Sequence, residues 1–123
     1  MTSLTIHTID SAPEASKPLL ENALKSFGIL PNLHGVLASS PQLLEGYQVL
    51  HNLFTQSSFT AEELTVVWQG INVEHDCHYC VPGHTGIAHS MKVDPALTEA
   101  LRNEQTMTTP KLQALLDLTL IIV

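Results

Sequence analysis

The sequence predicts a single all-helical domain spanning residues 1–123, and three observations support this fold class. Apolar residues recur three and four positions apart along most of the chain, whereas no stretch alternates convincingly over the length of a strand. Helix-start signals, in which a capping residue is followed by proline or by a glutamate three positions on, precede several of these stretches. No low-complexity linker or internal repeat divides the chain, and its 123 residues are typical of one domain.

The first elements follow a short N-terminal arm at about residues 1–12, which carries a hint of extended structure. A helix is expected from about residue 19 to 27, with Pro18 in its first turn and Gly28 as its stop. A second helix is expected at 32–39, with Asn32 as its cap.

The middle of the chain carries two further expected helices. Ser40 and Pro41 start one whose apolar face continues to Phe54, and the polar residues 55–58 then predict a loop. Thr60 and Glu63 form a capping box, in which each side chain satisfies the free backbone N–H of the other residue. The helix behind it carries a clear apolar stripe, formed by Leu64, Val67, Trp68 and Ile71.

The last third of the chain supplies the remaining helices. One is expected from Asp94–Pro95 to about Glu104, and the last begins at Pro110 behind Thr108 or Thr109. The sequence stops at residues 121–123 with no capping residue or polar tail. We expect this apolar end either to be buried against a neighbouring subunit or to continue in a longer natural helix.

Composition excludes several classes of function. A formal net charge of −7 gives no general attraction to nucleic acid or to anionic lipid. The longest apolar run, residues 120–123, is far shorter than the roughly 18 residues of a membrane span. The N-terminus lacks the basic region and apolar core of a signal peptide. A reducing cytoplasm is therefore the expected compartment, where a Cys-x-x-Cys is more often catalytic or metal-binding than structural.

The residues with the most distinctive chemistry gather in one short stretch. Both cysteines and four of the seven histidines lie between residues 75 and 89. If residues 77–90 are helical, Cys77, Cys80, His84 and Ala88 project along one stripe of that helix. We interpret this stretch as a redox site.

The chemistry of such a site depends on one thiol being partly ionised beside the other. A helix N-terminus supports a thiolate through its unpaired N–H groups, and the spacing of Cys77 and Cys80 places the two thiols one turn apart. His84, four residues after Cys80, could take or return a proton near neutral pH. Glu74, just upstream, could orient an imidazole or relay protons. This chemistry requires neither a metal ion nor another cofactor.

The same residues allow other interpretations. Cys77, Cys80, His84 and one more histidine could bind zinc in a binding or assembly module, but zinc modules usually draw their ligands from separate elements. A thioredoxin-like motif would follow a strand, and a c-type haem site would need a histidine at Val81. The isolated histidines are interpreted as surface or satisfied polar residues: His7, His34 and His51.

The region from about residue 59 to 88 resembles the alkyl hydroperoxidase D-like branch of the carboxymuconolactone decarboxylase family. The resemblance is carried by Phe-Thr-Ala-Glu-Glu at 59–63 and by the Cys-x-x-Cys-x-x-x-His of Cys77, Cys80 and His84. It implies an all-helical fold that assembles into homo-oligomers, and it implies peroxide reduction or thiol–disulfide exchange. Members that are decarboxylases generally lack the cysteine pair, so a non-redox decarboxylase is the lesser expectation.

The resemblance also implies roles for individual residues. Cys80 matches the cysteine that attacks peroxide, Cys77 its proton donor and resolving partner, and His84 the proton-relay histidine. An external dithiol would then reopen the resulting disulfide. The family's relay glutamate commonly lies twelve residues before the first cysteine, where this sequence has Thr65. Glu74 is our candidate for a relocated carboxylate, with Glu63 as the other acid in question.

Overall fold

The computed structural model describes residues 3–123, and all of the regular structure in that range is helical. The all-α prediction is therefore confirmed. The chain divides into two compact units, one that ends at Phe54 and one that begins at Thr55. That these units together form the single predicted domain stays a prediction, and each is described by itself below. Between residues 3 and 123, no helix has the length and apolar character that crossing a membrane would need.

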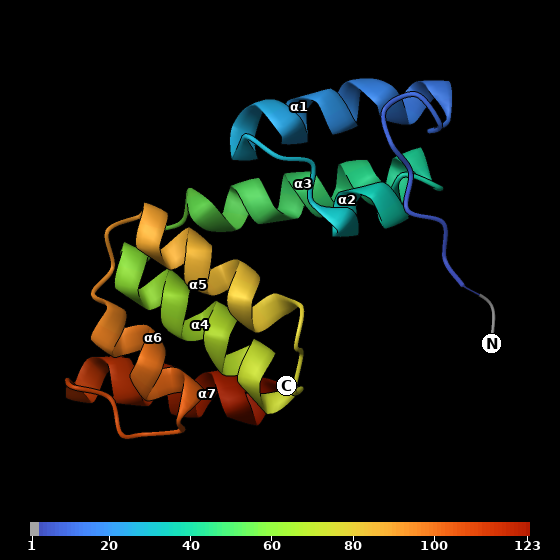
Figure 1. Cartoon of the computed structure of the whole chain (residues 1–123). Helices are drawn as coiled ribbons and strands as arrows, with labels where there is room; N and C mark the ends of the chain where they lie inside the picture. The colour runs from blue at the N-terminus through green and yellow to red at the C-terminus, as the bar shows by residue number, and fades with distance from the viewer. Residues whose placement is uncertain (1–2) are drawn as a thin grey trace. The chain divides into compact units, whose positions relative to one another are not determined.

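The first unit consists of a short 3-10 turn and three α-helices (Figure 1). The turn is Glu14–Ser16, and the helices are α1 (Lys17–Phe27), α2 (Asn32–Leu37) and α3 (Pro41–Thr55). As predicted, α1 ends at Gly28, whose φ of 74° lies in the left-handed region that glycine adopts without strain. The predicted cap of α2 is wrong: Pro31 occupies the cap position, and no side chain caps this helix. A small apolar core joins the elements, formed by Ala12, Leu20, Ala38 and Leu44.

The N-terminal arm is anchored on α2. Residues 3–8 form neither helix nor strand, and the N–H of His7 donates to the carbonyl of Gly35 at 3.0 Å. A Cβ atom at Gly35 would lie 2.7 Å from the carbonyl oxygen of His7, so this close approach requires glycine. The arm is held by this backbone hydrogen bond and by a contact of 3.1 Å between Nε2 of His7 and the hydroxyl of Ser39, while its apolar residues Leu4 and Ile6 remain exposed.

His34 is a buried and satisfied polar residue, as the sequence predicted. Its Nδ1 lies 3.1 Å from Nε2 of Gln48, which also donates to the carbonyl of Leu19. The rings of Phe27 and Tyr47 contact the imidazole edge-to-face. Burial lowers the pKa of His34, because removal from water disfavours the charged form.

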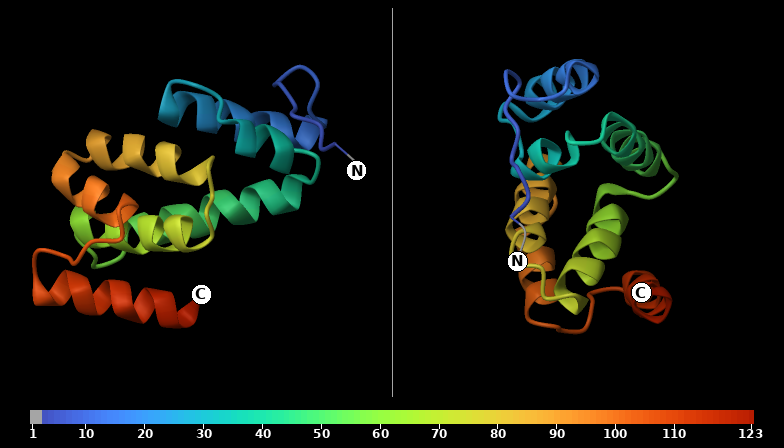
Figure 2. Two further views of the ribbon diagram at one scale, coloured as in Figure 1. Left: turned by 60° about the horizontal axis from the view of Figure 1, so that its bottom comes forward. Right: turned by 90° about the vertical axis from the view of Figure 1, so that its right-hand side faces the viewer.

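The second unit packs three helices around α4 (Figures 1 and 2). Its helices are α4 (Ala61–Glu74), α5 (Cys80–Ser90), α6 (Pro95–Arg102) and α7 (Pro110–Ile122), and α4 contacts each of the others. At Gly70 a Cβ atom would lie 2.9 Å from a methyl group of Leu116, so the missing side chain lets α7 approach α4 closely. The buried apolar core of this unit comprises Val66, Ala88, Val93, Leu97, Leu101, Met107 and Leu112.

The predicted starts of α4, α6 and α7 are confirmed. Thr60 and Glu63 form the capping box of α4, and the side chains of Asp94 and Thr109 cap α6 and α7. The helix ends are less regular, because α4, α5 and α6 are each followed by a non-glycine residue with positive φ. These residues are Asp76 (48°), Lys92 (63°) and Glu104 (52°). Aspartate tolerates this conformation better than most residues, and Asp76 directs the chain from α4 into the cysteine motif.

Candidate functional site: a disulfide between two helices

The active-site helix begins later than predicted. The expectation of a helix over residues 77–90 is wrong at its start, because α5 begins at Cys80 and Cys77 lies in the preceding turn. Pro82 has no N–H, so the carbonyl of His78 cannot receive the next helical hydrogen bond. Cys77 therefore does not share the helical stripe that Cys80, His84 and Ala88 occupy on α5.

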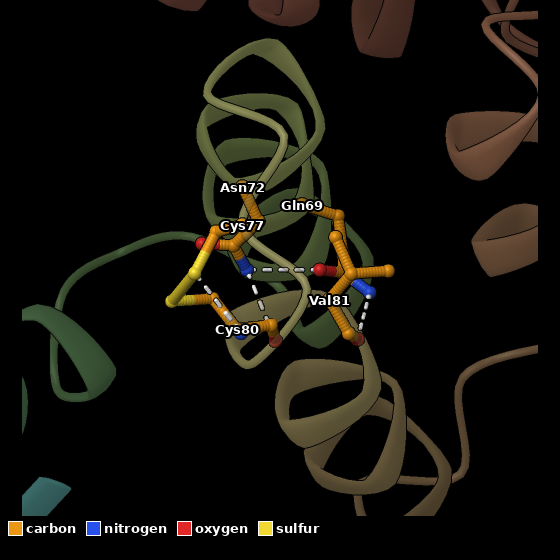
Figure 3. Close-up of a disulfide and its surroundings, with 5 residues drawn as sticks. All are labelled: Gln69, Asn72, Cys77, Cys80 and Val81. Carbon is orange, nitrogen blue, oxygen red and sulfur yellow. Dashed lines mark hydrogen bonds between the residues drawn. A yellow bond between two sulfur atoms is a disulfide. The ribbon is translucent and has the colours of Figure 1, made fainter.

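Cys77 and Cys80 are joined by a disulfide (Figure 3), with their Cα atoms 5.2 Å apart. Both residues are partly exposed. The predicted proximity of the two thiols is therefore confirmed. A disulfide across two residues at the start of a helix can be reached by an external thiol, because neither cysteine is enclosed in the core.

The backbone of Cys77 is fixed by both neighbouring helices. Its N–H donates to the carbonyl of Asn72 at 2.9 Å, closing the C-terminus of α4. Its carbonyl accepts from the N–H of Val81 at 3.0 Å, and its Sγ accepts from the N–H of Cys80 at 3.1 Å. By these last two hydrogen bonds Cys77 supplies acceptors to the turn that leads into α5, whose cap position is Tyr79.

A buried polar network ties the cysteine motif to α4 (Figure 3). Gln69, which is fully buried, donates through Nε2 to the carbonyl of Val81 at 3.0 Å. The same Nε2 also donates to the hydroxyl of Thr85 at 2.9 Å. Asn72 donates through Nδ2 to Oε1 of Gln69 and to the carbonyl of Cys80. The network thus holds the first turn of α5 against α4 through directed hydrogen bonds as well as apolar packing.

Gln69 and Asn72 were not among the site residues predicted from the sequence. Both lie next to the apolar stripe of α4, three residues apart, so their side chains share one face of the helix. Two amide side chains on a face that must be buried are the signal that could have found them, since buried polar groups need partners. Their partners on α5 were not apparent from the sequence, because they lie up to 16 residues away.

The structure places His84 beside Trp68. The centroids of the two rings are 5.0 Å apart, and Nδ1 of His84 is buried. His84 follows Cys80 by one helical turn on α5, as the sequence predicted. Trp68 is the only tryptophan of the chain. Its fluorescence therefore reports directly on the surroundings of the imidazole.

The two candidate carboxylates differ sharply in their surroundings. Glu63 is buried, accepts from the N–H of Thr60 at 2.9 Å and forms an ion pair with Lys111. The hydrogen bond from Lys111, followed by that from Thr60, lowers the pKa of Glu63. Glu74 is the last residue of α4, and its exposed side chain makes no hydrogen bond or ion pair with residues 3–123. Thr65, at the usual glutamate position, is buried and donates to the carbonyl of Ala61.

A surface recess of about 500 Å³ lies beside the cysteine motif. Residues of α4, of the turn that carries Cys77, of α5 and of α6 line the recess: Val73, Asp76, His78, Val81, Pro82, Thr85 and Arg102. Asp76 and His78 flank Cys77 in the chain, and their side chains are exposed, 3.8 Å apart. A recess of this size next to the disulfide could receive part of a substrate.

Among the described residues, no three side chains of histidine, cysteine, aspartate or glutamate come together as metal ligands. The zinc interpretation therefore lacks a ligand set between residues 3 and 123. His75, His78 and His89 are exposed in this structure.

The sequence matches no protein-family model, and no characterised protein matches it significantly.

Proposed function

We propose that this protein is a cytoplasmic thiol-dependent oxidoreductase that cycles Cys77 and Cys80 between dithiol and disulfide. The observation that supports this most directly is the Cys77–Cys80 disulfide, partly exposed at the start of a helix. The oxidant would be a peroxide or a substrate disulfide, and an external dithiol would restore the reduced state. No metal ion or organic cofactor takes part in this cycle.

With peroxide as the oxidant, the resemblance noted above supplies the roles. Cys80 attacks the peroxide oxygen and becomes a sulfenic acid, with loss of an alcohol or water. The Cys77 thiol then condenses with the sulfenic acid, expelling water and forming the disulfide. His84 relays protons, and Glu74 is the candidate carboxylate of that relay. The position of His84 on α5, one turn after Cys80, supports its part in this scheme.

Mass spectrometry of the purified protein tests the cycle directly. Treatment of the reduced protein with peroxide or with a small disulfide should remove about two mass units, and a dithiol should restore them. If neither oxidant produces this reversible loss, the proposed function is wrong.

The Cys80→Ser variant tests the peroxide branch. It should lose peroxide consumption, because neither the sulfenic acid at Cys80 nor the internal disulfide can form. Unchanged peroxide turnover in this variant would eliminate Cys80 as the attacking residue. The Ser39→Ala variant, which alters a residue of the first unit, serves as a control and should turn over normally.

We also propose that the protein works as a homo-oligomer. Large apolar side chains remain exposed on α3 and α7, among them Leu50 (69%) and Ile121 (81%). Exposed apolar side chains favour association, because burial removes them from water. Sedimentation equilibrium over a range of concentrations measures the subunit number, and a monomer at all concentrations would contradict the proposal.

A further inference from the structure

The two sulfur atoms of the disulfide have different hydrogen-bond environments. Sγ of Cys77 accepts from the N–H of Cys80 at 3.1 Å. Among residues 3–123, no amide donates to Sγ of Cys80, whose residue instead accepts through its backbone carbonyl from Asn72. The start of α5 therefore directs an N–H donor at one sulfur and not at the other.

This environment does not depend on the disulfide. The backbone of Cys77 is held by hydrogen bonds to Asn72 of α4 and from Val81 of α5. The donor, the N–H of Cys80, belongs to the first turn of an 11-residue helix that the Gln69–Asn72 network fixes in place. When the disulfide is reduced, Sγ of Cys77 therefore remains within reach of that N–H. A hydrogen bond to a thiolate is stronger than one to a neutral sulfur, because the acceptor is charged.

The charged groups around Cys77 do not oppose this effect strongly. Asp76 and His78 flank it with highly exposed side chains 3.8 Å apart, and Glu74 and His75 are exposed at the end of α4. On α6, Arg102 forms an ion pair with Glu99. Exposed charges of this kind are screened by water and salt, whereas the N–H of Cys80 acts at contact distance.

We infer that Cys77 carries the thiolate of the reduced protein and that it attacks the sulfur of a substrate disulfide. This inference rests on the proposed function and identifies the attacking cysteine for the case in which the oxidant is a disulfide. It also departs from the roles that the resemblance implies, in which Cys80 is the attacking cysteine.

The reaction then proceeds in two exchange steps. The Cys77 thiolate attacks one sulfur of the substrate, a mixed disulfide forms, and the other substrate sulfur leaves as a thiolate. The Cys80 thiol loses its proton to solvent or to a nearby base and attacks Sγ of Cys77. The second substrate thiolate leaves as the Cys77–Cys80 disulfide closes. The substrate gains two electrons, and with two protons it becomes two thiols.

A matched pair of variants, Cys77→Ser and Cys80→Ser, tests the inference. Each keeps the start of α5: serine at position 77 can cap the helix, and serine at position 80 retains the N–H that donates to Cys77. At pH 7, iodoacetamide should alkylate Cys77 in Cys80→Ser at least about tenfold faster than Cys80 in Cys77→Ser. Circular dichroism confirms that both variants are folded.

A second measurement uses oxidised glutathione as the disulfide probe. Cys80→Ser should accumulate a mixed disulfide on Cys77, because the residue that would release it is absent, and Cys77→Ser should react much more slowly. Equal or faster reaction of Cys80 in either assay would overturn the inference. If the wild-type protein still shows its reversible loss of two mass units in that case, the proposed function stands and only the assignment of Cys77 fails.

Discussion

Two helix starts in the second unit use the same hydrogen-bond pattern with different chemistry. At α4, the hydroxyl of Thr60 accepts from the N–H of Glu63 at 3.3 Å, and its carbonyl accepts from Leu64. At α5, Sγ of Cys77 accepts from the N–H of Cys80 at 3.1 Å, and its carbonyl accepts from Val81. In both cases a side chain satisfies the N–H three residues later, as helix capping requires.

The two helix starts differ in how the residue three positions later bonds back to the first residue. At α4, one carboxylate oxygen of Glu63 accepts a hydrogen bond from the N–H of Thr60, and the other oxygen forms an ion pair with Lys111. At the start of α5, Cys80 instead forms a disulfide bond with Cys77. The first arrangement is purely structural, whereas the second can open and close with the redox state. Backbone N–H donors at a helix start thus stabilise the fold at α4, and at α5 we propose that they also support the chemistry of the cysteine pair.

The largest expected effect on stability comes from breaking the hydrogen-bond network of Gln69 and Asn72, which holds the start of α5 against α4. Gln69→Leu removes hydrogen bonds to Val81 and Thr85 and leaves the buried amide of Asn72 without one acceptor. The free energy of unfolding should fall by about 2–3 kcal/mol, measured by urea denaturation of the reduced protein. Thr85→Val, which removes one partner of the network, should cost less. A change below about 0.5 kcal/mol in Gln69→Leu would show that the network does not support α5.

A second variant distinguishes the carboxylates near the two helix starts. Glu74→Gln should slow peroxide turnover by about a factor of ten and shift the pH profile of the rate, because Glu74 is the proposed proton-relay carboxylate. Glu63→Gln should leave turnover near the wild-type rate, since Glu63 already bonds Thr60 and Lys111. Steady-state kinetics over a pH series makes the comparison. Equal rates in wild type and Glu74→Gln would refute the relocated relay.

Removing the cap of α4 should have a smaller and purely structural effect. Thr60→Ala leaves the N–H of Glu63 without its side-chain acceptor, so stability should fall by about 1 kcal/mol. Thr60→Ser keeps the hydroxyl and should remain close to wild type. The rate of Cys77–Cys80 disulfide formation should not change in either variant. A slower rate in Thr60→Ala would mean that the two helix starts are coupled.

The smallest effect is expected in the pH dependence of stability. The hydrogen bonds from Lys111 and Thr60 lower the pKa of Glu63 below its ordinary value of 4.5. The ionised carboxylate therefore stabilises the fold fully above that value, and this contribution is lost as the pH falls through the lower folded pKa. The difference in Tm between wild type and Glu63→Gln should be constant near neutral pH and shrink in acid. A difference that persists undiminished well below pH 4.5 would argue against the ion pair as its source.

Much of the fold could be predicted because helix starts and apolar stripes are local features. The caps at Thr60, Asp94 and Thr109 follow from two to four neighbouring residues, and the structure has all three. The error at residues 77–79 has a local cause as well. Periodicity extended the helix back to Cys77, whereas the missing N–H of Pro82 interrupts the hydrogen-bond ladder there.

The sequence by itself determined the helical class, the starts of α4, α6 and α7, and the nearness of the two cysteines, because each depends on residues only a few positions apart. Tertiary structure alone decided which polar groups meet across helices. Gln69 reaches Thr85, and Glu63 reaches Lys111, only after α5 and α7 have packed on α4. Such pairings depend on how apolar faces dock, and the docking of α7 on α4 is what brings Lys111 to Glu63.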